Sequence, residues 1–393
     1  MKSIIAAFMF LLSAFALHAQ TGDGWSATWG TSPEYTGPGD MPKMSLAHTT
    51  VRQIIHASLE GKRVRLSLSN FHSDEPVEIK AVYLAEAGES DNIVASTAKY
   101  VTFGGKRNVT IPAKGNITSD AVKFKVKRCA RIAITVAYGT NVPEHATSHR
   151  GSRTTSYIAK GMVGPEDKFE TAEKVDHWYN ILSLEVKAKA NVIAVLGNSI
   201  TDGRGSTTNL QNRWTDRMAE HLPDGCGVVN LGIGGNSVLE GGISQPLMRR
   251  YKDELSFHKG ITHLIIYEGT NDIGSSRQDP DKLAERLIEA YKEIVAYAHG
   301  KGIRVYVATI TPTKGHDYFS PSHEKARTAV NSWIRSAEGF EGVIDFDELV
   351  KNPDDHEQLQ KEYSDDWLHL NPQGYEAMGR FAAGIIGKDL KNK

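Results

Sequence analysis

The chain has 393 residues and a formal net charge of −1, with 46 lysine and arginine residues against 47 aspartate and glutamate residues. Its basic residues are scattered, so neither nucleic acid nor an anionic membrane surface is a favoured partner, and a neutral substrate fits better. The length suits two domains, each able to bury its own core.

An apolar segment opens the chain. Lys2 precedes an almost unbroken apolar run from Ile4 to Leu17, which ends at small residues around Ala19. The run is too short to span a bilayer comfortably, and its flanks are typical of a cleavable signal peptide. We therefore expect residues 1–19 to be a signal peptide that exports the protein to the periplasm or the extracellular space. No later stretch is apolar enough to predict a membrane helix.

Residues 20–186 show a period of two. In RVRLSLSN, Val64, Leu66 and Leu68 alternate with polar residues, and AVKFKVK alternates in the same way. Alternation of this kind predicts half-buried strands. Further strand-like runs, TVRQIIHASL, VTIPA and RIAITVAYG, are separated by turn-rich segments. Many short strands with frequent turns predict an N-terminal antiparallel β-sandwich domain.

From residue 187 to residue 393 the pattern changes to short apolar strands that alternate with helices. Five runs predict buried strands: NVIAVLG, CGVVNLG, THLIIYEG, RVYVATI and GVIDF. Leu210, Trp214, Met218 and Leu222 recur every four residues and predict an amphipathic helix between two of them. Strict alternation of strand and helix predicts an α/β domain with a parallel sheet covered on both faces.

The start of two later helices can also be read from the sequence. Asp279-Pro280 and Ser320-Pro321 each supply an N-cap residue followed by proline at the first helical position. Sheets of this class carry their chemistry on the loops at the carboxyl ends of the strands. Those loops are therefore where functional residues are expected.

Three of these loops, together with the segment just before the last predicted helix, contain groups suited to acyl transfer. Ser199 lies in GNSITDG after the first strand, and Gly235 in NLGIGGN after the second. Asn271 lies in EGTNDIG after the third strand, while Asp366 and His369 lie in DWLHLN, just before the last predicted helix. Glycines in the second loop let backbone N–H groups approach a ligand closely.

The chemistry explains why these residue types are needed together. A serine hydroxyl is a weak nucleophile, so a histidine must take its proton, and a carboxylate holds that histidine in the correct tautomer. The developing oxyanion needs fixed donors. We expect Ser199, His369 and Asp366 to form a catalytic triad, with the N–H groups of Ser199 and Gly235 and the Asn271 amide as the oxyanion hole.

The four segments, in this order, resemble the conserved blocks of the SGNH (GDSL-like) hydrolases. The resemblance implies a flavodoxin-like three-layer domain with a five-stranded parallel sheet, in which Ser199, Gly235, Asn271 and His369 are the four named residues and Asp366 is the triad acid. One departure is Asn198, where the family usually has Asp. Because this position supports the loop, we expect altered hydrogen bonding there and not lost activity.

The N-terminal domain carries a second resemblance. WSATWGTSPEYT, TVRQIIHASLEGKRVRLSLSN and SHRGSRTTSY look like the leader domain, a jelly-roll-like sandwich, of bacterial two-domain SGNH proteins similar to acetyl xylan esterases. This implies a secreted serine esterase that removes O-acetyl or other short acyl groups from carbohydrate. The expected partner is then an acetylated oligo- or polysaccharide, such as the acetylated xylan of plant cell walls.

Two other functions are compatible with the same residues. A lysophospholipase or a general short-chain aryl or alkyl esterase uses the same triad. A protein of another class would bind carbohydrate through its sandwich and carry an inactive hydrolase domain. No pairing of His or Cys shows zinc-like spacing, so we expect neither a metal nor another cofactor.

Several residues have a structural interpretation beside a functional one. Gly234 is the alternative to Gly235 as an oxyanion donor, and Asp365 is the alternative to Asp366. Asp202 and Asp272 are expected to brace their loops, and Arg213 and Trp214 to cap and pack. We expect His149, Arg150 and Arg153 to be solvated loop residues, the alternative being that they reach the mouth of the active site. Cys129 and Cys226 are expected to be buried, unpaired thiols.

Overall fold

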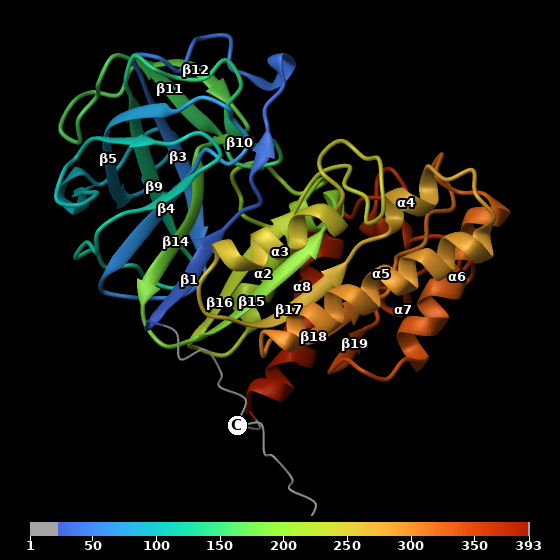
Figure 1. Cartoon of the computed structure of the whole chain (residues 1–393). Coiled ribbons are helices and arrows are strands. Elements are labelled where there is room, and N and C mark those ends of the chain that lie inside the picture. Colours follow the sequence, from blue (N-terminus) through green and yellow to red (C-terminus); the bar gives the residue numbers. More distant parts are fainter. Residues whose placement is uncertain (1–22, 392–393) are drawn as a thin grey trace, which may run out of the picture.

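A computed structural model of the chain describes residues 23–391 (Figure 1). The expected signal peptide, residues 1–19, lies outside this range. The described chain has an all-β N-terminal half, residues 23–187, and an α/β C-terminal half, residues 188–391. Within the described range no helix combines the length and the apolar character that crossing a membrane requires.

The N-terminal half consists of antiparallel sheets, as its period-two pattern predicts. One sheet has the strand order β1-β14-β4-β8, another has the order β12-β11-β3-β9-β5-β6 with β7 beside β5, and a small one has the order β13-β10-β2. The strands are β1 (Trp25–Gly30), β2 (Glu34–Tyr35), β3 (Thr49–Ala57), β4 (Val64–Ser69), β5 (Val77–Glu86), β6 (Lys99–Val101), β7 (Val109–Ile111), β8 (Asn116–Thr118), β9 (Ala130–Tyr138), β10 (Thr147–His149), β11 (Ser156–Lys160), β12 (Thr171–Val175), β13 (Trp178–Tyr179) and β14 (Ile181–Lys187).

The core of this half lies between its two larger sheets. Val64 and Leu66 of β4 and Ile132 and Ile134 of β9 belong to the same buried cluster. Because successive side chains of a strand point to opposite faces, each sheet contributes every second residue to this core. The sandwich architecture is therefore as predicted.

The C-terminal half contains a five-stranded parallel sheet with the order β16-β15-β17-β18-β19. In chain order this is 2-1-3-4-5, the flavodoxin-like arrangement. The strands are β15 (Asn191–Gly197), β16 (Cys226–Gly232), β17 (Ile261–Tyr267), β18 (Arg304–Ala308) and β19 (Gly342–Ile344), and each falls within one of the five predicted runs or begins one residue before it. Gly197 pairs with Gly232 on one side and Tyr267 on the other, so three strands end at the same level.

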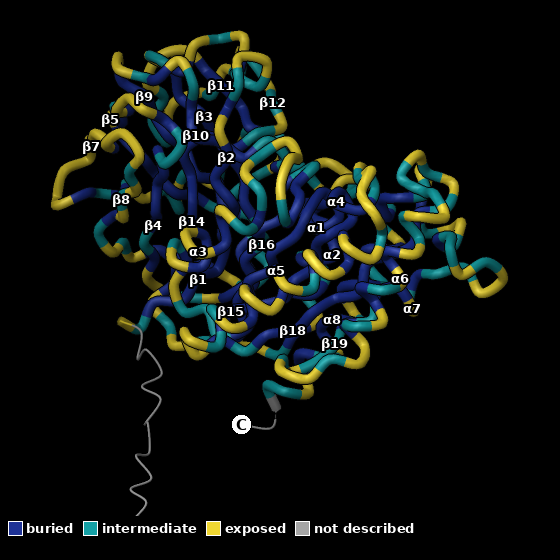
Figure 2. Tube along the Cα trace, turned by 45° about the vertical axis from the view of Figure 1, so that its right-hand side comes forward, coloured by how far each residue is buried: buried dark blue, intermediate teal, exposed yellow. Residues whose placement is uncertain are grey.

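Helices cover both faces of this sheet. Val192, Ala194 and Leu196 of β15 pack in one cluster with α3, α5 and α6, whereas Ile193 and Val195 pack in another with α2, α7 and α8. Figure 2 shows the buried segments running through both halves. The helices are α1 (Ser199–Asp202), α2 (Trp214–His221), α3 (Leu247–Phe257), α4 (Thr270–Gly274), α5 (Pro280–Gly300), α6 (Pro321–Ser336), α7 (Phe346–Val350) and α8 (Pro372–Lys391). The three-layer α/β fold is confirmed.

Three predictions about local structure need correction. The AVKFKVK segment makes only isolated bridges, Val64 with Val122 and Gly61 with Val126, although Phe124 and Val126 are buried as its alternation predicts. Leu210 lies outside α2 and is 62% exposed, because that helix begins only at Trp214. Cys226 is buried but Cys129 is only half-buried, and both thiols are free.

The two halves meet along one edge of the parallel sheet. β1 runs beside the edge strand β16 (Figure 1). The Ala27 N–H donates to the Lys259 carbonyl over 2.9 Å, and the Val228 N–H donates to Ser58 Oγ over 2.8 Å. A Cβ atom at Gly227 would lie 2.3 Å from the Ala27 carbonyl oxygen, so the close approach requires glycine there. The sandwich therefore shields backbone groups that an edge strand leaves open.

Candidate active site

Ser199 is held at the carboxyl end of the central strand β15. Asn198 caps the short helix α1, and its Oδ1 accepts the Ile200 N–H over 3.0 Å. The cap places Ser199 at the first helical position, where the backbone N–H has no partner within the helix. A Cβ atom at Gly197 would lie 2.1 Å from Thr201 Oγ1, so a side chain there would displace this turn. Asn198, the departure from the family pattern, thus keeps a supporting role.

The structure joins Ser199 to the two residues expected to activate it. Ser199 Oγ lies 2.8 Å from His369 Nε2, and His369 Nδ1 lies 2.7 Å from Asp366 Oδ2. The other oxygen of Asp366 accepts the backbone N–H groups of Leu368 and His369 over 3.0 and 2.8 Å. The loop before α8 therefore carries its own carboxylate and fixes the ring that faces the serine.

The protonation of this chain follows from its surroundings. Burial lowers the pKa of His369, and although the Asp366 hydrogen bond and charge raise it, the net value lies below the ordinary 6.5. Arg204 and His316 add to the lowering. Burial raises the pKa of Asp366, but its hydrogen bonds from His369 outweigh this and hold the pKa below the ordinary value. At neutral pH the arrangement is thus a carboxylate, a neutral imidazole and a hydroxyl.

The residues expected to form the oxyanion hole line the same cleft. Gly235, Gly234 and Asn271 surround Ser199 in a cleft of about 510 Å³. Gly235 has a φ of 70°, and in the described chain its N–H donates to no protein carbonyl. The Asn271 amide donates to the Asn236 carbonyl over 2.7 Å, which leaves its second N–H for the cleft. Both glycines reach the cleft, as does the amide.

Tyr318 lines the cleft but lies outside the four motif segments. Its hydroxyl donates to Asn271 Oδ1 over 3.1 Å and so fixes which end of the amide faces the cleft. The ring packs over Gly274, where a Cβ atom would lie 2.2 Å from it. Tyr318 follows the fourth parallel strand, so the rule that chemistry gathers at the carboxyl ends of strands could have indicated it.

The N-terminal half also contributes to the cleft. Arg150 and Arg153 line its mouth, together with Glu34, Asp40 and His177. His149 Nε2 lies 2.9 Å from Asp202 Oδ1, and Arg153 donates to Asp202 Oδ2 over 2.8 Å. The interpretation of His149, Arg150 and Arg153 as solvated loop residues was wrong, because burial between the halves pairs them with carboxylates.

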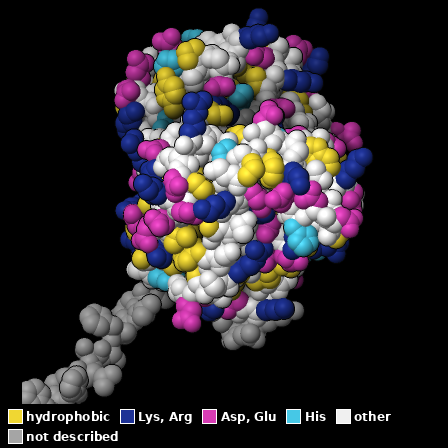
Figure 3. Space-filling model, turned by 90° about the vertical axis from the view of Figure 1, so that its right-hand side faces the viewer, with side chains coloured by type: hydrophobic (Ala, Val, Ile, Leu, Met, Phe, Trp, Pro, Cys, Tyr) yellow, Lys and Arg dark blue, Asp and Glu magenta, His cyan; other side chains and the backbone are white. Residues whose placement is uncertain are grey.

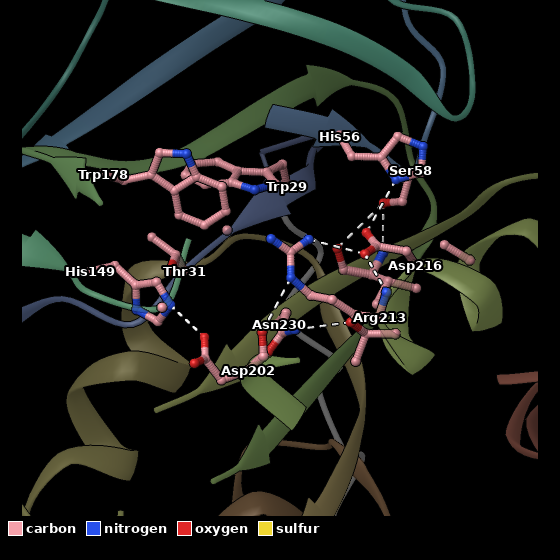
Figure 4. Close-up of a pocket in the computed structure, with 15 residues that line it drawn as sticks. Trp29, Thr31, His56, Ser58, His149, Trp178, Asp202, Arg213, Asp216 and Asn230 are labelled. Atoms are coloured by element: carbon pink, nitrogen blue, oxygen red, sulfur yellow. Dashed lines mark hydrogen bonds and ion pairs between the residues drawn. The ribbon is translucent and has the colours of Figure 1, made fainter. Parts of the chain in front are cut away.

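A small pocket of about 30 Å³ lies beside α1, between the two halves (Figure 4). Arg213 crosses it beneath Trp178, 5.7 Å from the ring centre, and donates to the carbonyls of Ser152 and Asp202 and to the Asp216 carboxylate. His56 contacts the same Asp216 carboxylate at 3.2 Å. Arg213 therefore caps α2 and links the two halves, in line with the capping and packing role predicted for it.

The two other acidic residues singled out from the sequence act as braces. Asp272 accepts the backbone N–H groups of Val238 and Leu239 over 2.8 and 2.9 Å, which fixes the loop after β16. Asp202 fixes α1 through the contacts given above. Residues 23–391 contain no group of three or more His, Cys, Asp or Glu side chains placed to hold a metal ion.

The chain is similar to known proteins over part of its length. Residues 195–377 match the GDSL-like lipase/acylhydrolase family. An acetylxylan esterase of Xylanibacter ruminicola is 28% identical over 226 residues, which is 51% of this chain and 44% of that protein. This chain therefore spans less than half the length of that relative.

Two solved structures are similar at lower identity. A carbohydrate acetylesterase from Sinorhizobium meliloti is 18% identical, with a TM-score of 0.39 over 50% of this chain and 99% of the other. An aryl esterase of M. smegmatis is 18% identical, with a TM-score of 0.40 over 51% of this chain and 99% of the other. On the family match, the C-terminal half of this chain is a GDSL-like lipase/acylhydrolase (SGNH) domain, of a family of carboxylic ester hydrolases.

Proposed function

We propose that this chain is an exported serine esterase that removes O-acetyl groups from carbohydrate, such as acetylated xylan of plant cell walls. The observation that carries the proposal is the continuous chain of hydrogen bonds from Asp366 through His369 to Ser199 Oγ. The name of the acetylxylan esterase relative supports the substrate class.

The mechanism has two acyl-transfer steps. Ser199 Oγ attacks the ester carbonyl carbon while His369 Nε2 takes the hydroxyl proton. The tetrahedral oxyanion is stabilised by the Ser199 and Gly235 N–H groups and the Asn271 amide, each worth roughly 3 to 4 kcal/mol. The C–O bond to the sugar breaks, and the sugar oxygen leaves with the proton from His369. Water, deprotonated by His369, then attacks the acetyl-enzyme and releases acetate and free Ser199.

The lining of the cleft favours a short acyl group on a neutral substrate. Ile243 and Leu368 are its large aliphatic residues, and most of the remainder is polar or glycine. Two of its three arginines are paired with carboxylates, since Arg150 pairs with Glu34 at 2.6 Å and Arg153 with Asp202 at 2.8 Å. A long-chain ester would need more apolar surface to bury its acyl chain.

Acetate release separates this function from its alternatives. We expect the wild type to release acetate from acetylated xylan and to cleave p-nitrophenyl acetate much faster than the palmitate ester. A preference for long-chain esters or lysophospholipids would replace the proposal with a lipolytic function. The Ser199→Ala variant is the matched control, because it keeps the fold and loses only the attacking oxygen.

An inactive, carbohydrate-binding protein is the rival from another class. A fluorophosphonate probe labels an activated serine covalently, so we expect stoichiometric labelling of the wild type and none of Ser199→Ala. An unlabelled wild type that still binds acetylated xylan would favour the binding protein.

Export is part of the proposal and rests on the apolar segment of residues 1–19. Expression of the full chain in a Gram-negative host, followed by N-terminal sequencing of the periplasmic fraction, tests it. We expect the mature chain to begin at Gln20. Recovery of the intact N-terminus in the cytoplasm would contradict export.

A further inference from the structure

A second cleft, of about 490 Å³, opens between the two halves beside the catalytic one. We call it the interdomain cleft. Glu34, Asp40, Arg150 and Ile243 line both clefts, so the two adjoin each other. The Arg150 guanidinium donates to Ser244 Oγ over 2.6 Å, and Ser244 Oγ donates to Glu34 over 2.5 Å, which joins the two halves at the shared wall.

Apolar side chains that the fold leaves exposed gather along this path. Tyr35, from the N-terminal half, is 49% exposed, and Ile243, from the C-terminal half, is 67% exposed. Both line the interdomain cleft, in which Phe71 and Phe257 also meet across the halves with ring centres 5.2 Å apart. Large exposed apolar side chains that line a concave site indicate binding more than packing.

The charges of the interdomain cleft are largely matched within it. Arg150 pairs with Glu34 at 2.6 Å, Lys114 with Asp74 at 2.9 Å and Arg250 with Glu254 at 2.5 Å. His72 adds no net charge at neutral pH, because burial lowers its pKa. Figure 3 shows basic and acidic side chains likewise interspersed on one face of the molecule. A cleft of this kind suits a neutral occupant that offers hydroxyl groups to the remaining carboxylate oxygens.

We propose that the interdomain cleft binds the neutral sugar chain that carries the ester, on the alcohol side of the scissile bond. This inference rests on the proposed function and adds the site of the polymer. Sugar rings present an apolar C–H face, which matches the rings of Tyr35 and Phe71. They also present an edge of hydroxyl groups, which matches the Asp40 carboxylate. Acetate and one sugar fill only the catalytic cleft, so the adjoining cleft holds the neighbouring sugar units.

Two variants alter the cleft at positions that the fold tolerates. Tyr35→Ala removes an exposed ring. Gly37→Trp fills the cleft: Gly37 has φ −71° and ψ 167°, which any residue adopts, and the nearest atom to an added Cβ is Asp40 Oδ2 at 3.8 Å. Met162→Ala is the matched control, since Met162 is 71% exposed and lines neither cleft.

The test compares kcat/KM on acetylated xylan, acetylated xylose and p-nitrophenyl acetate. We expect Gly37→Trp and Tyr35→Ala to lower the ratio of polymer to aryl acetate activity about tenfold, the equivalent of about 1.4 kcal/mol. The loss should appear mainly in KM, and acetylated xylose should follow the aryl ester. Met162→Ala should keep both ratios.

Product inhibition gives an independent measurement. Xylohexaose should inhibit hydrolysis of p-nitrophenyl acetate by the wild type at concentrations where xylose does not, and Gly37→Trp should relieve that inhibition. Wild-type activity on acetylated xylan with an unchanged polymer ratio in both variants would overturn the cleft assignment and leave the esterase function standing. A wild type that cleaves aryl acetate but neither carbohydrate ester would overturn the proposed function, and this inference with it.

Discussion

Asp202 Oδ1 lies 2.9 Å from His149 Nε2, although the two residues belong to different halves of the chain. Asp202 ends the helix that Ser199 begins, and both members of the pair are buried. Burial lowers the pKa of His149, but the hydrogen bond to Asp202 and the charge of Asp202 raise it by more. The net pKa of His149 is therefore above the ordinary value. The N-terminal half therefore holds the helix that Ser199 begins through a buried ion pair.

Loss of this pair should affect both stability and turnover. In Asp202→Asn, His149 and Arg153 lose their buried counter-charge, which costs about 3 kcal/mol in the free energy of unfolding. We expect kcat to fall severalfold with little change in KM, because Ser199 is displaced and the cleft is kept. Urea unfolding and steady-state kinetics on p-nitrophenyl acetate measure the two effects.

Asp224→Asn provides the matched control. Asp224 also pairs across the halves, with Arg128 at 3.1 Å, but its side chain is 95% exposed. An exposed pair contributes about 0 to 1 kcal/mol, so stability and kcat should hardly change. Equal effects of the two variants would contradict a special role for the buried pair.

The three residues of the proposed triad should differ in their effects. Ser199→Ala and His369→Ala each remove a group that takes part directly, and kcat should fall on the order of 10⁵-fold or more. In Asp366→Asn, kcat should fall less, on the order of 10⁴-fold. The wrong tautomer of His369 is then favoured, while its ring stays in place. A near-normal rate in His369→Ala would remove the mechanism.

The pH profile should report the neutral form of His369. Because its pKa lies below 6.5, kcat/KM should reach its plateau by neutral pH, with the acid limb below that value. Arg204 is a cation that lowers this pKa, so Arg204→Gln should raise it and shift the acid limb to higher pH. In this variant kcat/KM should reach a plateau of similar height, but at a higher pH. Lys123 is an exposed charge on the sandwich, so Lys123→Gln should leave the acid limb at the same pH. An acid limb that does not shift in Arg204→Gln would refute its assignment to His369.

Tyr318 should act through Asn271. Asn271→Ala removes an oxyanion donor, and kcat should fall on the order of 10²- to 10³-fold. Tyr318→Phe removes only the hydroxyl that orients the amide, so a smaller fall in kcat with unchanged KM is expected. Combining both changes distinguishes orientation from independent contribution: the double variant should be no worse than Asn271→Ala. Additive losses would show that Tyr318 contributes in another way.

Much of the C-terminal fold could be predicted because its signals are local. A short apolar run such as NVIAVLG favours a strand covered on both faces, and Asp279 before Pro280 supplies an N-cap and a first helical position. Three of the four segments follow strand ends that the register brings level, so their convergence follows from topology, whereas the segment of Asp366 and His369 precedes α8.

The contacts between the halves could not be predicted in this way. His149 ends the short strand β10 and Asp202 ends the short helix α1, and nothing in the period of either segment shows that burial will pair them. The wrong prediction that Leu210 lies in a helix has a related cause. The spacing of four residues extends back to Leu210, but the helix begins only after its N-cap, Arg213. Sequence periodicity indicates which face of an element is buried. It does not indicate which residue of a distant segment a polar side chain will contact.

The contact of β1 with β16 has a consequence for biosynthesis. The sandwich precedes Cys226–Gly232 in the chain, so it is synthesised before this edge strand. A nascent strand with open amide and carbonyl groups is the type of segment that recruits identical chains into aggregates. Because β1 lies beside β16 in the folded chain, the sandwich covers this edge and leaves it unavailable to a second copy of the chain.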